Sequence, residues 1–193
     1  RFSIEFAKRG FSVTGVDKTE FLLEKAIQNA QNQNVNIDFI QVDMIDYIKP
    51  DAFDLILNMF TSFGYFEKED DDLKVLKNVY TSLKKGGQFI IDIMGKEVLS
   101  RIFQSTLSSK GEDGSLWIQR PQIINNWTRV KNEWILIKKN SIKTHHLTHA
   151  IYSGKELKDL LHHAGFKKVQ LYGDFDGSEY GINSERLIAI ATK

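Results

Sequence analysis

The chain has 193 residues, of which 41% are hydrophobic, and 26 lysines and arginines face 25 aspartates and glutamates. The net charge of +1 argues against a nucleic-acid partner, and no apolar run approaches the roughly 18 residues of a membrane span. The lack of cysteine excludes disulfides and thiolate chemistry and predicts a cytoplasmic protein. The length predicts one domain over residues 1–193.

Helical and strand patterns alternate along the first half of the chain. Apolar spacing predicts a helix over Phe2–Lys8, closed by Gly10. Strands and helices are then expected, in order, at Ser12–Val16, 19–29, Ile37–Val42, Phe53–Asn58, Lys68–Leu83 and Gly87–Asp92. This alternation predicts an α/β fold with a doubly wound, mostly parallel sheet.

A different pattern begins after Gly95. A helical stretch near Lys96–Leu107 is followed by a loop-like segment, Lys110–Ser115. We expect residues 110–152 to form an inserted antiparallel meander that acts as a lid. Its three strands are predicted at Trp127–Val130, Glu133–Lys138 and Lys143–Tyr152, with turns at Lys131-Asn132 and Lys139-Asn140-Ser141.

The last part returns to helix and strand. Ser153 and Glu156 have the spacing of a capping box, which starts a helix that ends at Gly165. Two strands, Lys168–Tyr172 and Arg186–Thr192, follow it and are joined by a long polar loop.

Asp17 ends the first predicted strand, and two interpretations of it stay open. In nucleotide-binding α/β domains, an acid at this place hydrogen-bonds the ribose hydroxyls. Asp17 and Glu20 also have the spacing of a capping box, which would start the next helix without any ligand.

Four short motifs follow one another along the chain: Val13-Thr14-Gly15-Val16-Asp17, Val42-Asp43-Met44, Phe53-Asp54-Leu55-Ile56-Leu57-Asn58 and Leu83-Lys84-Lys85-Gly86-Gly87. Together they resemble a class I S-adenosylmethionine-dependent methyltransferase. The resemblance runs over residues 1–92 and resumes at 153–193, where the last two strands would supply the antiparallel hairpin that ends the family's sheet. The first strand and glycine-rich turn of the family do not occur in this sequence, so we expect the native polypeptide to extend upstream of Arg1 and to carry them.

The resemblance implies S-adenosyl-L-methionine as cofactor and five residues that hold it. Asp17 would accept the ribose hydroxyls, and Lys18 would lie over the adenine edge. Asp43 would accept from the adenine amino group, while Met44 would offer the ring a backbone N–H and an apolar surface. Asn58 would face the methionine portion of the cofactor.

The acceptor of the methyl group is expected to be a small molecule that is methylated on nitrogen or oxygen. The aromatic loop of residues 59–66 would line its pocket, with Tyr65 as the main candidate, although ordinary core packing explains Phe60 and Phe63 equally well. Trp134 belongs either to a lid over the substrate or to the meander's own core. Tyr152 ends the meander, and Arg186 could meet a substrate carboxylate.

Two other function classes stay open. A nicotinamide-dependent dehydrogenase would also place Asp17 on a ribose, and a methyltransferase fold without cofactor would be a binding module. His145, His146 and His149 do not indicate a metal site, because a strand divides them between two faces and no carboxylate is interleaved.

Overall fold

The computed structural model describes residues 2–193. The chain divides into two compact units, one up to Lys49 and one from Pro50 to Lys193, and each is described by itself. Among the described residues, no helix combines the length and apolar character needed to cross a membrane.

The first unit pairs two short parallel strands with two helices. Its elements are α1 (Phe2–Lys8), β1 (Thr14–Asp17), α2 (Glu20–Asn32) and β2 (Asp38–Gln41). The predicted glycine stop of α1 is confirmed, since Gly10 has a φ of 86°, a left-handed conformation that glycine adopts without steric cost. β1 and β2 run parallel with Thr14 opposite Asp38 and Asp17 opposite Gln41, so both strands end at the same edge.

The second unit is built on a four-stranded sheet in the order β3-β4-β10-β9. These strands are β3 (Phe53–Asn58), β4 (Leu83–Ile93), β9 (Lys168–Tyr172) and β10 (Leu187–Thr192). β3 and β4 are parallel, whereas β10 runs antiparallel to both β4 and β9. The predicted mixed sheet with a C-terminal antiparallel hairpin is therefore confirmed.

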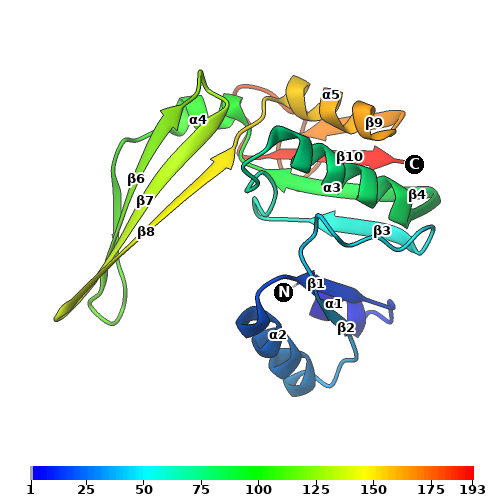
Figure 1. The fold of residues 1–193 in the computed structure, drawn as a ribbon, viewed down its shortest axis with the longest axis horizontal. Coiled ribbons are helices and arrows are strands. Elements are labelled where there is room, and N and C mark those ends of the chain that lie inside the picture. Colours follow the sequence, from blue (N-terminus) through cyan, green and yellow to red (C-terminus); the bar gives the residue numbers. More distant parts are fainter. Residues whose placement is uncertain (1) are drawn as a thin grey trace. The chain divides into compact units, whose positions relative to one another are not determined.

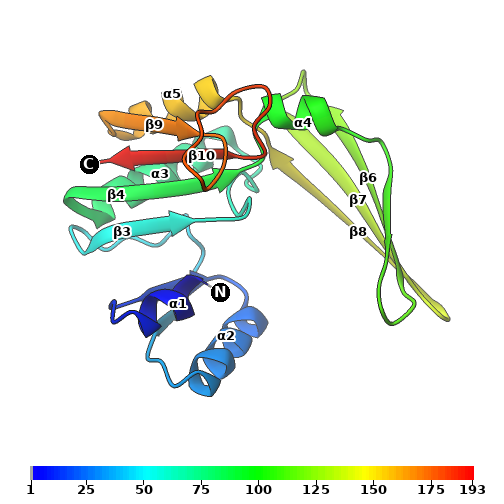
Figure 2. The ribbon, with the colours of Figure 1, turned by 180° about the vertical axis from the view of Figure 1, so that it is seen from behind.

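Two helices, α3 (Glu69–Ser82) and α5 (Gly154–Ala164), cover one face of this sheet (Figures 1 and 2). The buried core lies between them and the strands, where Leu76, Phe89, Leu157 and Phe166 are at most 1% exposed. The rings of Phe89 and Phe166 stack with their centroids 6.1 Å apart. Burial of such large side chains supplies most of the stability of a domain of this size.

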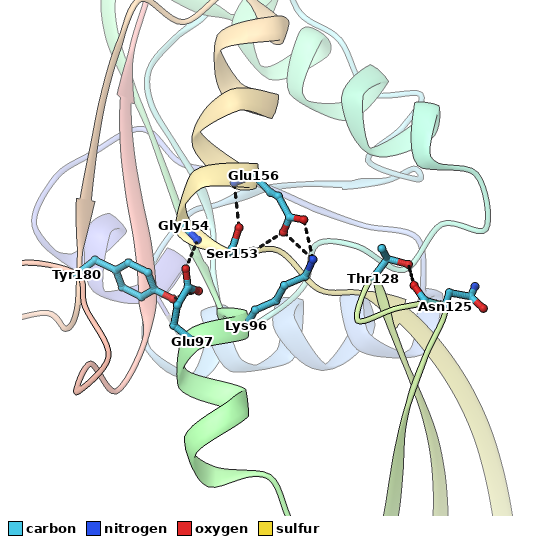
Figure 3. A network of polar contacts seen from close by, with 8 residues as sticks. All are labelled: Lys96, Glu97, Asn125, Thr128, Ser153, Gly154, Glu156 and Tyr180. Atoms are coloured by element: carbon cyan, nitrogen blue, oxygen red, sulfur yellow. Dashed lines mark hydrogen bonds and ion pairs between the residues drawn. The ribbon is translucent and has the colours of Figure 1, made fainter.

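A polar network joins the start of α5 to α4 (Lys96–Ile102), as Figure 3 shows. The predicted capping box is confirmed, because Glu156 N–H donates to Ser153 Oγ and Ser153 N–H donates to Glu156. Glu97 on α4 accepts hydrogen bonds from Gly154 N–H at 3.1 Å and from the Tyr180 hydroxyl at 2.7 Å. This carboxylate therefore ties the polar loop before β10 to two helix starts.

The insertion is a second four-stranded sheet, antiparallel throughout, in the order β5-β6-β7-β8. It extends away from the first sheet of its unit (Figures 1 and 2). Its strands are β5 (Leu107–Lys110), β6 (Leu116–Ile124), β7 (Arg129–Lys138) and β8 (Ser141–Ala150).

The predicted three-stranded meander was wrong in several places. The helix α4 ends at Ile102 instead of continuing to Leu107, and neither β5 nor β6 was predicted. The strands predicted at Trp127–Val130 and Glu133–Lys138 are not separate, because a single strand, β7, runs from Arg129 to Lys138. Lys131-Asn132 is not a turn but lies within β7, where cross-strand pairs with both neighbours hold the backbone extended. The true turn is Asn125-Asn126-Trp127, three residues in succession with positive φ.

Candidate active site

The predicted adenosine-binding residues gather at one edge of the first unit. Val42 N–H donates to Asp17 C=O at 3.1 Å, which continues the pairing of β1 and β2 up to the start of Asp43. Lys18 Nζ lies 3.6 Å from Asp43 Oδ2, and Met44 follows directly. The structure therefore brings Asp17, Lys18, Asp43 and Met44 together at the carboxyl ends of adjacent parallel strands, where such sheets bind ligands.

Asp17 does not form the capping box that its spacing allowed. The N-cap residue of α2 is Thr19, which has no side-chain cap bond, and Asp17 Oδ1 instead accepts the Thr19 N–H at 2.8 Å. This local bond is an Asx-type turn and uses one carboxylate oxygen. Within residues 2–193 no group donates to Oδ2, so this acceptor oxygen at the strand end suits a ribose hydroxyl.

Asn58 lies at the carboxyl end of β3 in the second unit, opposite Ile91 of β4, and is half-buried. The loop that follows it is strained: Phe60 and Thr61 have φ values of 57° and 55°. Non-glycine residues in this region cost of order 1–3 kcal/mol each, and they persist only where their surroundings hold them.

The buried carboxylate of Asp92, at the end of β4, holds this loop. Its Oδ2 accepts the Phe60 N–H at 3.0 Å, and its backbone oxygen accepts the Thr61 N–H at 2.9 Å. Arg186 Nη1 donates to both carboxylate oxygens, at 2.8 and 3.1 Å. Asp92 therefore holds the strained residues Phe60 and Thr61 in place, and it also binds the guanidinium of Arg186.

Arg186 is thus already engaged within the chain. Its guanidinium lies over the rings of Phe60 and Phe175, at 5.6 and 5.0 Å from their centroids. The side chain is 35% exposed while that of Asp92 is 1% exposed. Contact with a substrate carboxylate stays a prediction for Arg186, and the structure shows a loop-holding role in addition.

The loop of residues 59–66 is attached to the base of the inserted sheet through Gly64. Ala150 N–H donates to Gly64 C=O at 2.7 Å, and a Cβ on Gly64 would come within 2.9 Å of the Ala150 carbonyl oxygen. With a φ of 94°, this position needs glycine for both its conformation and its close approach. The attachment places Tyr65 against His149, with ring centroids 5.3 Å apart.

Tyr152, Asp72 and Arg129 form a polar cluster near this contact. Tyr152 donates its hydroxyl to Asp72 Oδ2 at 2.5 Å, and Arg129 donates to the Phe66 carbonyl oxygen at 2.7 Å. Burial raises the pKa of Asp72, although the bond from Tyr152 and the charge of Arg129 oppose the rise. The predicted substrate residue Tyr152 therefore has its hydroxyl bound to a buried carboxylate.

Trp134 lies farther out on the inserted sheet. Trp134 of β7 pairs with His145 of β8, whereas Val130 pairs with His149. The two cross-strand pairs are four residues apart along β7. At about 3.3 Å per residue, Trp134 lies roughly 13 Å along the strand from the Tyr65 contact.

His149 was considered from the sequence only as a metal ligand. Within residues 2–193 no group of three potential metal ligands gathers.

Replacing Tyr152 with phenylalanine is expected to lower the free energy of unfolding by about 1.5 kcal/mol at pH 7, since a buried carboxylate loses a charged hydrogen bond. The pKa of Asp72 is raised in the folded state, so the charged carboxylate costs stability above that pKa and the cost disappears as the pH falls through it. The difference between the two proteins should therefore shrink on acidification. Urea denaturation from pH 4 to 7 measures it.

Tyr80→Phe is the matched control, because the ring of Tyr80 packs on Phe166 in the same unit. It should change stability by less than about 0.5 kcal/mol at every pH. A Tyr152→Phe difference that stayed constant with pH would mean that Asp72 is not the group involved.

The sequence model of the family described as "Methyltransferase domain" matches residues 1–87. A Geobacillus sp. (strain WCH70) protein named as a methyltransferase is 26% identical over 196 residues, which cover 99% of this chain and 79% of that protein. The glycine/sarcosine N-methyltransferase of Halorhodospira halochloris is 25% identical over 197 residues, covering 99% of this chain and 70% of the relative.

Among solved structures, the CcbJ methyltransferase from Streptomyces caelestis superposes with a TM-score of 0.85 at 15% identity. The match covers 98% of this chain and 82% of that chain. A likeness at this level of identity shows a common fold, in which the inserted sheet is included.

Proposed function

Since this chain is a class I S-adenosylmethionine-dependent methyltransferase, we propose that it methylates a nitrogen or oxygen atom of a small-molecule acceptor. When bound, the cofactor supplies an electrophilic methyl group on a sulfonium. In-line displacement by a lone pair then needs little from the protein beyond holding the acceptor atom in place. Nitrogen and oxygen are the lone-pair atoms that common small metabolites offer.

The cofactor roles that we propose follow the arrangement in the first unit and at the end of β3. Asp17 Oδ2 accepts hydrogen bonds from the ribose hydroxyls, while Asp43 and Met44 bind the adenine ring. Lys18 is kept beside that ring by its ion pair with Asp43. Asn58 faces the methionine portion.

The observation that carries the proposal is the attachment of the strained loop after β3 to the inserted sheet. Gly64 and Ala150 fasten the two segments, and the rings of Tyr65 and His149 meet where they join. We propose that this junction binds the acceptor, that residues 110–152 form its lid, and that Trp134 contacts the more distant part of the molecule. Tyr152 and Arg186 then act on the acceptor mainly by holding these segments in place.

Calorimetry of the chain with S-adenosylhomocysteine and with NAD is the first experiment. We expect heat with the former and none with the latter. Transfer of labelled methyl from S-adenosylmethionine should then be found in the small-molecule fraction of a cell extract and not in its RNA. Tight, salt-dependent RNA binding with label in RNA would contradict the choice of a small acceptor.

A further inference from the structure

His149 has a ring nitrogen that the fold leaves without a partner. Nδ1 is buried and forms no hydrogen bond. The side chain comes from the end of β8, is half-buried, and lies against the half-exposed ring of Tyr65 at an interplanar angle of 32°. With Nδ1 buried, Nε2 is the nitrogen that can meet a ligand.

The surroundings decide which nitrogen carries the proton. A proton on Nδ1 would bury an N–H group without an acceptor, at a cost of about 1–3 kcal/mol. We therefore assign the proton of the neutral ring to Nε2, where the ring is a hydrogen-bond donor. In this tautomer His149 cannot take a proton through its accessible nitrogen.

The charged and titratable neighbours keep this ring neutral. Burial, and then the positive charge of Arg129, lower the pKa of His149. Arg129 is in turn balanced by Asp72, which Tyr152 caps. Partial burial raises the pKa of Tyr65, so its phenol keeps its proton as well.

The rings that carry these two neutral donors thus lie 5.3 Å apart at the junction. The two arginines of this region already have partners, because Arg129 donates to the Phe66 carbonyl oxygen and Arg186 is bound by Asp92. A carboxylate accepts hydrogen bonds without offering any and presents two oxygens to two donors. We propose that His149 Nε2–H and the Tyr65 hydroxyl hold a carboxylate of the acceptor molecule. This inference rests on the proposed function, because it places the acceptor at the same junction.

The whole chain is labelled with ¹⁵N-histidine. Benzoate, benzylamine and S-adenosylhomocysteine are then added separately as probes. We expect benzoate, and not benzylamine, to shift the His149 Nε2–H resonance, which is assigned from its loss in His149→Leu. Calorimetry should give a benzoate affinity that is level between pH 7 and 8.5, since neither donor titrates there. The affinity should fall about tenfold in His149→Leu and in Tyr65→Phe.

Two further variants separate a binding role from a structural one. His149→Gln retains a side-chain N–H and should keep most of the affinity, whereas His145→Leu, at an exposed position on the same face, should change nothing. A benzylamine shift equal to that of benzoate, or unchanged benzoate affinity in His149→Leu, would overturn the proposal. If S-adenosylhomocysteine gives heat but benzoate does not bind, only this inference fails; if benzoate binds and S-adenosylhomocysteine does not, the proposed function fails instead.

Discussion

Replacing Arg186 with leucine is expected to lower the free energy of unfolding by about 3–5 kcal/mol, the cost of leaving a buried charge without its partner. Asp92 has a side chain that is only 1% exposed, so water cannot replace the two hydrogen bonds from the guanidinium. The Phe60 N–H alone would remain on this carboxylate. Urea denaturation at pH 7 measures the change.

An exposed ion pair of the same unit provides the control. Lys84 and Asp54 lie 2.8 Å apart with side chains 47% and 83% exposed, so Lys84→Leu should cost less than about 1 kcal/mol. The double variant Arg186→Leu/Asp92→Leu should recover part of the lost stability, because no buried charge is left. If Arg186→Leu costs as little as Lys84→Leu, the pair does not form in solution, and Arg186 is available to a substrate.

Replacing Asp17 with alanine should weaken the binding of S-adenosylhomocysteine by about 1.5–3 kcal/mol, or roughly ten- to a hundredfold. The carboxylate has two separable functions, since Oδ1 holds the Thr19 N–H and Oδ2 is assigned to the ribose. The protein should stay folded, because the lost turn bond lies at the surface. Calorimetry at constant salt measures the affinity.

Asp17→Ser distinguishes these functions. Its hydroxyl can still accept the Thr19 N–H, but it cannot offer two carboxylate oxygens to a pair of hydroxyls. Affinity should therefore stay as low as in Asp17→Ala while the stability returns. Unchanged affinity in both variants would mean that Asp17 serves only the turn before α2.

The doubly wound core could be predicted from sequence because its signals are local. β3 was placed at Phe53–Asn58 and α1 at Phe2–Lys8, as the structure has them, since a continuous apolar run and a glycine stop are visible without tertiary context. The methyltransferase interpretation is confirmed by the comparisons, which do not support the dehydrogenase alternative.

The inserted sheet was harder because its strands are polar on much of their surface. β6 contains Gln119, Arg120 and Pro121, and proline normally argues against a strand between two neighbours. Here Pro121 pairs with Asn132, which is itself a residue typical of turns. The Asn-Asn pair at 125–126 was the better turn signal, because asparagine tolerates the left-handed conformation.

The acceptor side of the site could be predicted only in part. Tyr65 was identified from its place in an aromatic loop, but its neighbour His149 is 84 positions later and meets it only through the bond between Gly64 and Ala150. The pairing of Arg186 with Asp92, 94 positions apart, is likewise a property of the folded sheet. Such contacts leave no local periodicity in the sequence.

The β5–β8 sheet is attached at one end and extends away from the other sheet of its unit. It is attached where Arg129 and Ala150 hydrogen-bond the loop of residues 59–66, while Ile142 near the opposite end is 70% exposed. Ten residues of β7 at about 3.3 Å each make a lever of roughly 30 Å. On our proposal that residues 110–152 form a lid, a fluorophore attached at Asn140 is expected to respond to acceptor binding, because a small rotation at the attachment becomes a large displacement at the tip.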